Sequence, residues 1–167
     1  DGGLLTGEPA EPENAGSNRT GKVTAAQPTL LSLLAEGGYI PVTASPACEG
    51  SGKALNINAD EAALHIASAL QAERLVFVLD LPGIMKNDQV IRHMDENDVE
   101  AAIRDGCITG GMIPKVRSSI EALKAGVGKI GITGYKKTGD LAEVLGGRAG
   151  STITLTENNT EREYSNG

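Results

Sequence analysis

The spacing of apolar and polar residues predicts alternating helices and strands along most of the chain. Apolar residues that recur every three or four positions indicate helices, and short continuous apolar runs indicate strands. Helices are expected at residues 28–37, 59–72, 96–104, 114–125 and 140–145. Strands are expected at residues 39–44, 75–79, 130–132 and 151–155. Strands that alternate with helices are typical of an α/β fold.

The segments between these elements are polar or rich in glycine and proline, which is typical of turns. Residues 7–22 contain almost no apolar side chains and indicate a loop or the tip of a hairpin. Residues 48–55 indicate a turn between two extended arms, and residues 80–90 indicate a longer loop. The segment from residue 157 onward is a polar tail that we expect to fray.

One predicted strand determines the kind of sheet that we expect. Leu75–Leu79 reads Leu-Val-Phe-Val-Leu, without any polar alternation. A strand with this pattern is typically buried on both faces, in a sheet that helices cover on both sides. The prediction is therefore an α/β three-layer sandwich with a mainly parallel sheet.

Charge and composition narrow the range of partners. The net charge is −7 without any block of lysine and arginine, so neither nucleic acid nor an anionic membrane is an expected partner. No apolar run approaches the roughly 20 residues that a membrane-spanning helix needs. His65 and His93 have no ligand-spaced partners, so no metal site is expected. Cys48 and Cys107 lack C-x-x-C spacing and are expected to be reduced thiols.

Three loops carry candidate chemistry, and the first stands at the start of a predicted helix. It contains Asn56, Asn58 and Asp60. A helix N-terminus favours anions, and the two amides could donate N–H groups to a substrate carboxylate. The alternative is structural, with Asn58 as the helix N-cap, Asp60 as a partner of the helix dipole and Asn56 as a turn residue.

The second loop directly follows the buried strand. Its residues are Asp80, Leu81, Pro82, Gly83, Ile84 and Met85. Proline followed by glycine marks a turn, and the aspartate stands where a nucleotide would lie at the carboxyl edge of a sheet. The alternative is a simple turn between a strand and the next element.

The third loop gives the strongest physical indication of function. Its residues are Ile108, Thr109, Gly110 and Gly111, and the helix that follows carries Lys115 in its first turn. The threonine and the two glycines let the backbone approach a polyphosphate. A cation at a helix N-terminus is unfavourable unless an anion lies beside it. The alternative is a surface lysine that extends into solvent, and the spacing is not that of a Walker A loop.

In this order and spacing, the segments resemble the acetylglutamate kinase branch of the amino acid kinase family. The likeness runs from Asp1 to about Leu155. It rests on E-G-G-Y-I-P-V from Glu36, N-I-N-A-D from Asn56, L-D-L-P-G-I from Leu79, I-T-G-G-M-I-P-K-V from Ile108 and G-S-T-I from Gly150. Several motifs together are far more specific than any one of them.

The resemblance implies a kinase that uses ATP and Mg²⁺ to phosphorylate the side-chain carboxylate of N-acetyl-L-glutamate, in arginine biosynthesis. Asn56 and Asn58 would bind the substrate, and Asp60 would orient lysines at the reaction centre. Lys115 would stabilise charge on the transferring phosphoryl group. Residues 80–85 and 108–111 would flank the ATP, with Mg²⁺ held mainly through the phosphates. A cytoplasmic enzyme that forms a homo-oligomer at full length is also implied.

The resemblance also implies how the chain is organised. Residues 1–156 would be the C-terminal part of the family's domain, followed by the polar tail at 157–167. Within that part, residues 1–58 would complete the substrate lobe, with a hairpin, and residues 59–156 would form the ATP-binding lobe.

The sequence departs from the family pattern near its beginning. The family carries an early K-x-G-G loop whose lysine is the partner of Lys115, and an early Gly-rich loop and arginine that grip the substrate; none of these is in the chain. We therefore expect a fold that is incomplete at its N-terminus, in a fragment or a natural short form. Losing one of two cations on the phosphoryl group should cost on the order of 10²-fold or more in rate, so the chain alone is expected to bind ATP weakly and to turn over negligibly.

Two other functions stay open. A sister group phosphorylates carrier-bound aminoadipate or glutamate in lysine-type biosynthesis, and Arg19–Lys22 and Ser45–Ala47 are similar to segments of that group. The other alternative is a catalytically impaired remnant that binds a nucleotide without transferring its phosphate.

Overall fold

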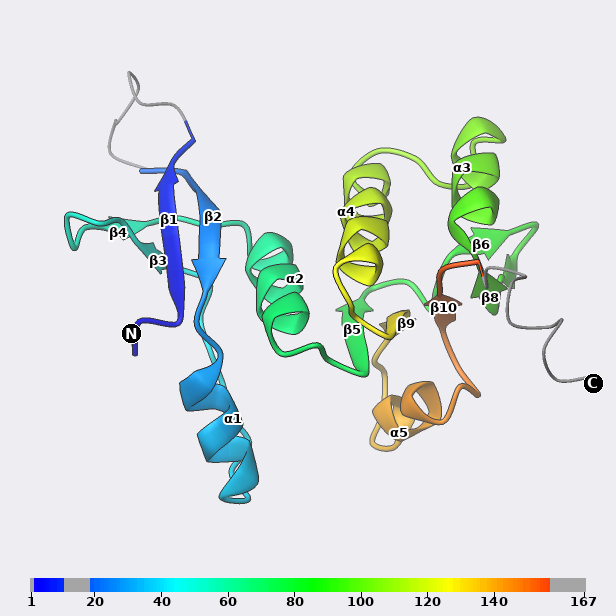
Figure 1. Cartoon of the computed structure of the whole chain (residues 1–167). Coiled ribbons are helices and arrows are strands. Elements are labelled where there is room, and N and C mark those ends of the chain that lie inside the picture. The colour runs from blue at the N-terminus through cyan, green and yellow to red at the C-terminus, as the bar shows by residue number, and fades with distance from the viewer. Residues whose placement is uncertain (1, 11–18, 157–167) are drawn as a thin grey trace, which may run out of the picture. The chain divides into compact units, whose positions relative to one another are not determined.

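The computed structural model describes residues 2–10 and 19–156, which form two compact units. Unit 1 comprises residues 1–75 together with 125–128, and unit 2 comprises residues 76–124 together with 129–167. Figure 1 traces the helices and strands of both units along the chain.

Unit 1 contains a four-stranded sheet with the order β2-β1-β3-β4. Its strands are β1 (Leu5–Pro9), β2 (Gly21–Ala26), β3 (Ala47–Cys48) and β4 (Ala54–Leu55). The pairs β1·β2 and β3·β4 are antiparallel, whereas β1·β3 is parallel. The interpretation of residues 7–22 as a hairpin tip is confirmed in part, and the tip is shorter than predicted because residues 7–9 and 21–22 already belong to β1 and β2. Residues 11–18 of that loop lie outside the described residues.

The core of unit 1 lies between this sheet and helix α2 (Ala59–Ala69). Apolar side chains from the sheet, from the segment that leads into α2 and from the helix itself form one buried cluster. Its members are Leu5, Val23, Ala47, Leu55, Ile57 and Ala62. This cluster fixes the backbone that leads into α2, where the first candidate loop lies.

Helix α1 (Thr29–Glu36) has the bounds that the leucine spacing predicts, with Pro28 and Gly37 as its caps. The strand predicted at residues 39–44 is wrong, because these residues carry no strand. Ile40 and Val42 are 90% and 94% exposed. A strand needs a neighbour for its backbone groups, and Pro41 has no N–H to donate. The apolar run therefore predicts more regular structure than residues 39–44 have.

Unit 2 contains a second four-stranded sheet, with the order β5-β9-β10-β8. Its strands are β5 (Arg74–Leu79), β9 (Lys129–Gly134), β10 (Ser151–Ile153) and β8 (His93–Met94). The pair β9·β10 is antiparallel and β10·β8 is parallel. The α/β class is thus confirmed, and the sheets of both units are mixed, so the predicted parallel arrangement holds for only some of the strand pairs.

The predicted loop at 80–90 contains a small hairpin. Its strands are β6 (Met85–Lys86) and β7 (Gln89–Val90), which pair antiparallel. Asn87 and Asp88 connect them with φ angles of 50° and 61°. Two residues with positive φ form the turn that best matches the twist of a hairpin, and Asn and Asp tolerate that conformation.

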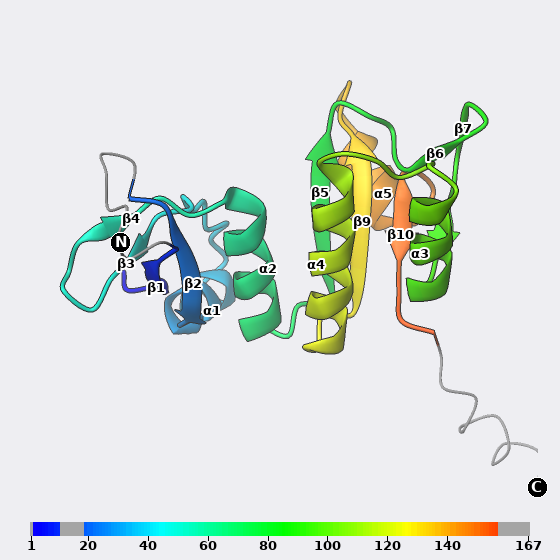
Figure 2. The same cartoon turned by 90° about the horizontal axis from the view of Figure 1, so that it is seen from above.

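Three helices cover the sheet of unit 2. They are α3 (Glu96–Arg104), α4 (Met112–Lys124) and α5 (Asp140–Leu145). Figures 1 and 2 show α3 and α4 on one face of the sheet and α5 on the other, which gives three layers within this unit. The bounds of α3 and α5 are those predicted, whereas α4 begins two residues before Pro114.

Burial along β5 only partly follows the prediction from its apolar run. Phe77 is 6% exposed, but Val78 is 51% exposed. The prediction that the whole run is buried on both faces is therefore wrong at Val78. Neither Cys48 nor Cys107 forms a disulfide bond, which agrees with the prediction of two reduced thiols. None of the helices in the described part of the chain is long and apolar enough to cross a membrane.

Candidate functional site

One edge of the sheet in unit 2 gathers two of the three candidate loops. Figure 2 shows the carboxyl ends of β5 and β9 and the beginning of α4 at the same edge. The loops after β5 and β9 touch each other there, because a Cβ atom built on Gly134 would lie 3.1 Å from the carbonyl oxygen of Leu81. Ligands of open α/β sheets bind at this kind of edge.

The loop after β5 has an exposed half and an anchored half. Asp80, Leu81 and Pro82 are exposed, whereas Gly83 and Ile84 are buried. The Ile84 backbone N–H donates a buried hydrogen bond to Ser151 Oγ at 2.8 Å. A Cβ atom at Gly83 would lie 2.8 Å from the same Oγ atom, so only glycine fits beside β10. The anchored half therefore holds the exposed half in place at the edge of the sheet. The last residue of this candidate loop, Met85, is half-buried.

The Gly-rich loop before α4 has an accessible backbone. Thr109 and Gly110 accept hydrogen bonds through their carbonyl oxygens from the N–H groups of Met112 and Ile113, each at 3.2 Å. No heavy atom lies within 4 Å of a Cβ atom built on Gly110 or Gly111. Ile108, by contrast, is 2% exposed and belongs to the core. The loop is thus fixed at its base and open around its two glycines.

Lys115 is the fourth residue of α4, and its side chain contacts β5. Its Nζ atom lies 4.5 Å from the centroid of the Phe77 ring, within the range of a cation–π interaction. The Lys115 carbonyl oxygen accepts a hydrogen bond from Ser119 Oγ at 2.8 Å. A cation in the first turn opposes the helix dipole unless an anion joins it, so this position suits a phosphate group.

The candidate loop of unit 1 is held by its backbone. The Asn56 N–H donates to the Arg19 carbonyl oxygen at 2.9 Å, and the Asn56 carbonyl oxygen accepts from the Gly21 N–H at 3.0 Å. The Asn56 side chain is exposed. Asn56 is therefore rigidly placed beside the beginning of β2, and its role toward a substrate stays a prediction.

Asn58 is the N-cap of α2. Its Oδ1 atom accepts hydrogen bonds from the N–H groups of Asp60 and Glu61, at 2.8 and 3.3 Å. The two acidic residues occupy the first turn, where the helix dipole favours them. The structural alternative is confirmed for Asn58 as the cap, while a substrate contact by its amide group and a lysine-orienting role for Asp60 stay predictions.

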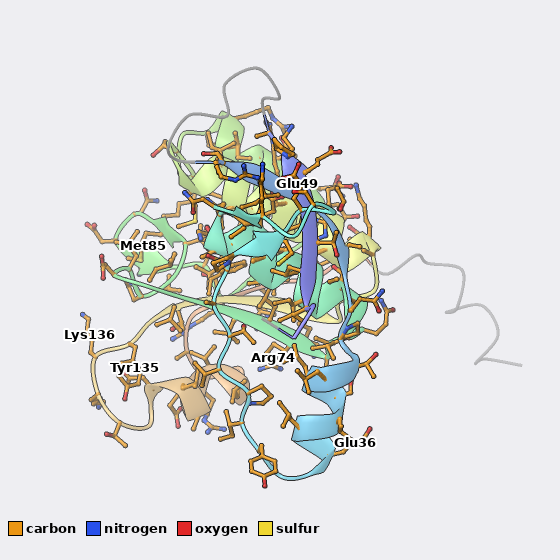
Figure 3. The ribbon with its side chains drawn as sticks, turned by 90° about the vertical axis from the view of Figure 1, so that its left-hand side faces the viewer. Glu36, Glu49, Arg74, Met85, Tyr135 and Lys136 are labelled. Carbon is orange, nitrogen blue, oxygen red and sulfur yellow. The ribbon has the colours of Figure 1, made fainter. Side chains whose placement is uncertain are left out.

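Arg19 has a structural role that the sequence did not indicate. Its guanidinium binds Glu49 at 2.7 Å and donates to the Ala54 carbonyl oxygen at 3.0 Å. Hydrogen bonds from Ser51 first, and then from Arg19, lower the pKa of Glu49. Figure 3 labels Glu49, which lies directly after β3. Because these bonds tie the segment before β2 to β4 and to the turn between β3 and β4, the presence of Arg19 is explained without a carrier-linked substrate.

Sequence reasoning missed two features of the edge in unit 2. One is the contact of Phe77 with Lys115, which a lone aromatic residue in the strand before a candidate loop could have suggested. The other is the loop after β9. Asp140 Oδ2 accepts hydrogen bonds from the Lys136 and Lys137 N–H groups at 2.8 and 3.0 Å, which lowers the pKa of Asp140. The loop also carries exposed Tyr135, which Figure 3 shows beside Lys136.

Unit 2 therefore brings together the loops at 80–85 and 108–111 with Lys115, while Asn56, Asn58 and Asp60 belong to unit 1. Among the described residues, no group of three or more His, Cys, Asp and Glu side chains could hold a metal ion.

Comparison with known proteins agrees with this geometry. Residues 4–134 match the model of the amino acid kinase family. The chain is 41% identical over 154 residues to the acetylglutamate kinase of Bacillus cereus (strain G9842), covering 92% of this chain and 58% of that protein. It is also 41% identical over 160 residues to the chloroplastic acetylglutamate kinase of Arabidopsis thaliana, covering 92% of this chain and 46% of that protein. The chain thus spans about half the length of these relatives.

A solved structure extends the comparison to the fold. The protein smu.665 from Streptococcus mutans UA159 superposes with a TM-score of 0.73 at 28% sequence identity, over 92% of this chain and 57% of that chain. Because neither unit alone contains 92% of the chain, the aligned residues come from both units.

Proposed function

The chain belongs to the amino acid kinase family, and we propose that it carries the nucleotide-binding and acceptor-binding residues of an acetylglutamate kinase. Such an enzyme transfers the γ-phosphoryl group of ATP to the side-chain carboxylate of N-acetyl-L-glutamate, in arginine biosynthesis. The identity of about 40% to acetylglutamate kinases over 92% of the chain supports this acceptor. The observation that supports the nucleotide site is the position of Lys115 at the beginning of α4, beside the open Gly110–Gly111 turn.

The edge of the sheet in unit 2 would bind the ATP. The Lys115 ammonium would contact the phosphates, and the positive end of the α4 dipole would favour their negative charge. The open space around Gly110 and Gly111 lets a polyphosphate approach the backbone. The exposed residues Asp80–Pro82 would flank the nucleotide on the other side. When bound, ATP supplies the phosphoryl group and a good leaving group.

The residues of unit 1 would bind the acceptor. A carboxylate acceptor is already ionised at neutral pH, so the enzyme needs no general base and must instead align two anions. Asn56 and Asn58 would donate amide N–H groups to the substrate, and Asp60 would orient lysines. Lys115 would stabilise the charge that develops on the phosphoryl oxygens. Electrostatic stabilisation of developing charge is usually the largest single contribution to catalysis.

The remaining assignments follow from this function. Mg²⁺ would be held mainly through the ATP phosphates, as is common for this ion. The division into a substrate lobe at 1–58 and an ATP-binding lobe at 59–156, a homo-oligomer at full length and a cytoplasmic location remain parts of the same proposal.

The test is nucleotide binding by the 167-residue chain and by two variants of one helix. Lys115→Met removes the cation at the beginning of α4, whereas Lys124→Met removes an exposed cation in its last turn. Because a charge-assisted contact contributes about 1.5–3 kcal/mol, the affinity for Mg·ATP should fall roughly tenfold to a hundredfold in Lys115→Met. Lys124→Met should bind as the parent chain does. Isothermal titration calorimetry measures all three affinities.

A second measurement tests the acceptor. N-acetyl-L-glutamate, and not aminoadipate or free glutamate, should raise the melting temperature of the ATP-bound chain, and Asn56→Ala should abolish that rise. Acyl phosphate trapped with hydroxylamine reports turnover, which we expect to be negligible for this chain alone. Absence of ATP binding, or equal binding by Lys115→Met, would falsify the proposed nucleotide site. Stabilisation by aminoadipate instead of N-acetyl-L-glutamate would overturn the acceptor assignment.

A further inference from the structure

The Lys115 ammonium lies over an aromatic face, 4.5 Å from the centroid of the Phe77 ring. Phe77 is on β5 and is 6% exposed, so its ring is held by the core of unit 2. Lys115 is half-buried in the first turn of α4. A long, flexible side chain is thus placed against a ring that is packed in the core.

The Phe77 ring and the beginning of α4 act on the Lys115 ammonium in opposite directions. The face of an aromatic ring carries partial negative charge and attracts a cation. The beginning of α4 carries partial positive charge and repels the same cation. The ring therefore offsets part of the unfavourable placement of Lys115 before any phosphate arrives. It also limits the rotamers of a long side chain before binding, so less conformational entropy is lost when a phosphate fixes the ammonium.

The ring differs from a charged partner in one respect. It carries no net charge and accepts no proton, so it attracts the ammonium without repelling an anionic ligand. It can therefore help to hold the cation without competing strongly against that ligand.

We propose that Phe77 is a positioning residue, which holds the Lys115 ammonium at the place where the phosphoryl group of ATP is bound. This inference rests on the proposed function, since it assigns the ring a purpose in binding and transfer. Phe77 acts through Lys115 and need not touch the nucleotide.

The composition of the chain permits an unusually clean test, because Phe77 is the only phenylalanine among the 167 residues. Expression in a phenylalanine auxotroph with 4-fluoro-, 3,5-difluoro- or 3,4,5-trifluorophenylalanine changes this one ring. Each added fluorine withdraws electron density from the ring face and nearly preserves its shape. Affinity for Mg·ATP should fall stepwise with the number of fluorines, by roughly threefold to tenfold over the series, since the interaction is of that order. The melting temperature should change little.

The matched control is the same fluorine series in the Lys115→Met variant, whose ATP affinity should not depend on the fluorine content. A series that is flat in the parent chain, or equally steep in Lys115→Met, would overturn the proposal, because Phe77 would then be a packing residue only.

A separate measurement detects the contact without any nucleotide. Protons on the ε-methylene of Lys115 should show an upfield ring-current shift in the NMR spectrum of the free chain, and Phe77→Leu should remove it. An unshifted ε-methylene overturns the proposed placement of Lys115. If the shift is present but the parent chain binds no ATP, the proposed function is wrong, and the positioning role is wrong with it. This outcome differs from ATP binding that does not depend on the fluorine content, which overturns the positioning role alone.

Discussion

Ser151 and Ile84 are joined by a buried hydrogen bond, in which the Ile84 backbone N–H donates to Ser151 Oγ at 2.8 Å. The two residues are 67 positions apart in the sequence. The bond connects strand β10 to the loop after β5 and thus to residues that we assign to the nucleotide. The loop is therefore positioned from the neighbouring strand, and not only by its own turn geometry.

Ser151→Ala should loosen this loop at a measurable cost. The substitution leaves the buried N–H of Ile84 without its acceptor, and an unsatisfied buried group costs about 1–3 kcal/mol. We expect the free energy of unfolding to fall by that amount in urea titrations, and the affinity for Mg·ATP to fall as well. Ser118→Ala is the control, because Ser118 is exposed on α4. An equal loss of stability in the two variants would contradict the anchoring role.

Gly83→Ala and Gly111→Ala should separate close packing from nucleotide approach. A Cβ atom at Gly83 would lie 2.7 Å from Val90 Cγ1 and 2.8 Å from Ser151 Oγ, whereas one at Gly111 would meet nothing within 4 Å. Gly83→Ala should therefore destabilise the fold by about 1–3 kcal/mol, as overpacking does. Gly111→Ala should leave the free energy of unfolding nearly unchanged.

The direct effects of Gly83→Ala and Gly111→Ala on Mg·ATP binding should have the opposite order to their effects on stability. Gly111→Ala places a methyl group where we propose that a polyphosphate approaches the backbone, so it should weaken Mg·ATP binding in a stable protein. Calorimetry at a temperature where both variants are folded measures this. Unchanged binding by Gly111→Ala would place the phosphates away from this turn.

Local signals explain which elements the sequence predicts well. Helix α3 has the predicted bounds because Asp95 and Asp98 form a capping box at its beginning, and such caps are visible in the sequence. Helix α1 likewise lies between Pro28 and Gly37. These boundaries depend on residues within one turn of each other, so no knowledge of the tertiary fold is needed.

Very short elements, and features that depend on residues distant in the sequence, were not predicted. The hairpin β6·β7 escaped detection because its strands have only two residues each. Residues 39–44 have a strand-like pattern but no strand. The contact between Phe77 and Lys115 joins two elements whose packing no local pattern reveals. The candidate loops themselves were found because glycine, proline and a misplaced cation are local signals.

Two isoleucines of unit 1 should respond very differently to the same truncation. Ile40 is 90% exposed, whereas Ile57 is 3% exposed and belongs to the core beside α2. Ile57→Ala should cost about 2–5 kcal/mol, because it removes buried groups and leaves a cavity. Ile40→Ala should change the free energy of unfolding by less than about 0.5 kcal/mol. A large loss on Ile40→Ala, measured in urea, would mean that residues 39–44 are packed in solution.

The ion pair between Glu100 and Arg117 should make stability depend on pH in a defined direction. Arg117 on α4 donates two hydrogen bonds to the Glu100 carboxylate on α3, at 3.0 and 3.1 Å. The hydrogen bond from Arg117 lowers the pKa of Glu100 in the folded state. A carboxyl group whose pKa is lower in the folded state than in the unfolded state stabilises the protein only where it is ionised.

The stabilisation is therefore fully present above the pKa of an unfolded glutamate, and it is lost as the pH falls through the lower pKa of folded Glu100. Glu100→Gln should be less stable than the parent chain at neutral pH, and the difference between their melting temperatures should close in acid. Both side chains are partly exposed, so added salt should also reduce the difference. Arg117→Gln should show the same pH dependence, and the double variant should add no further loss, since either substitution alone removes the pair. A gap between Glu100→Gln and the parent chain that stays constant down to acid pH would mean that the pair contributes packing and not charge.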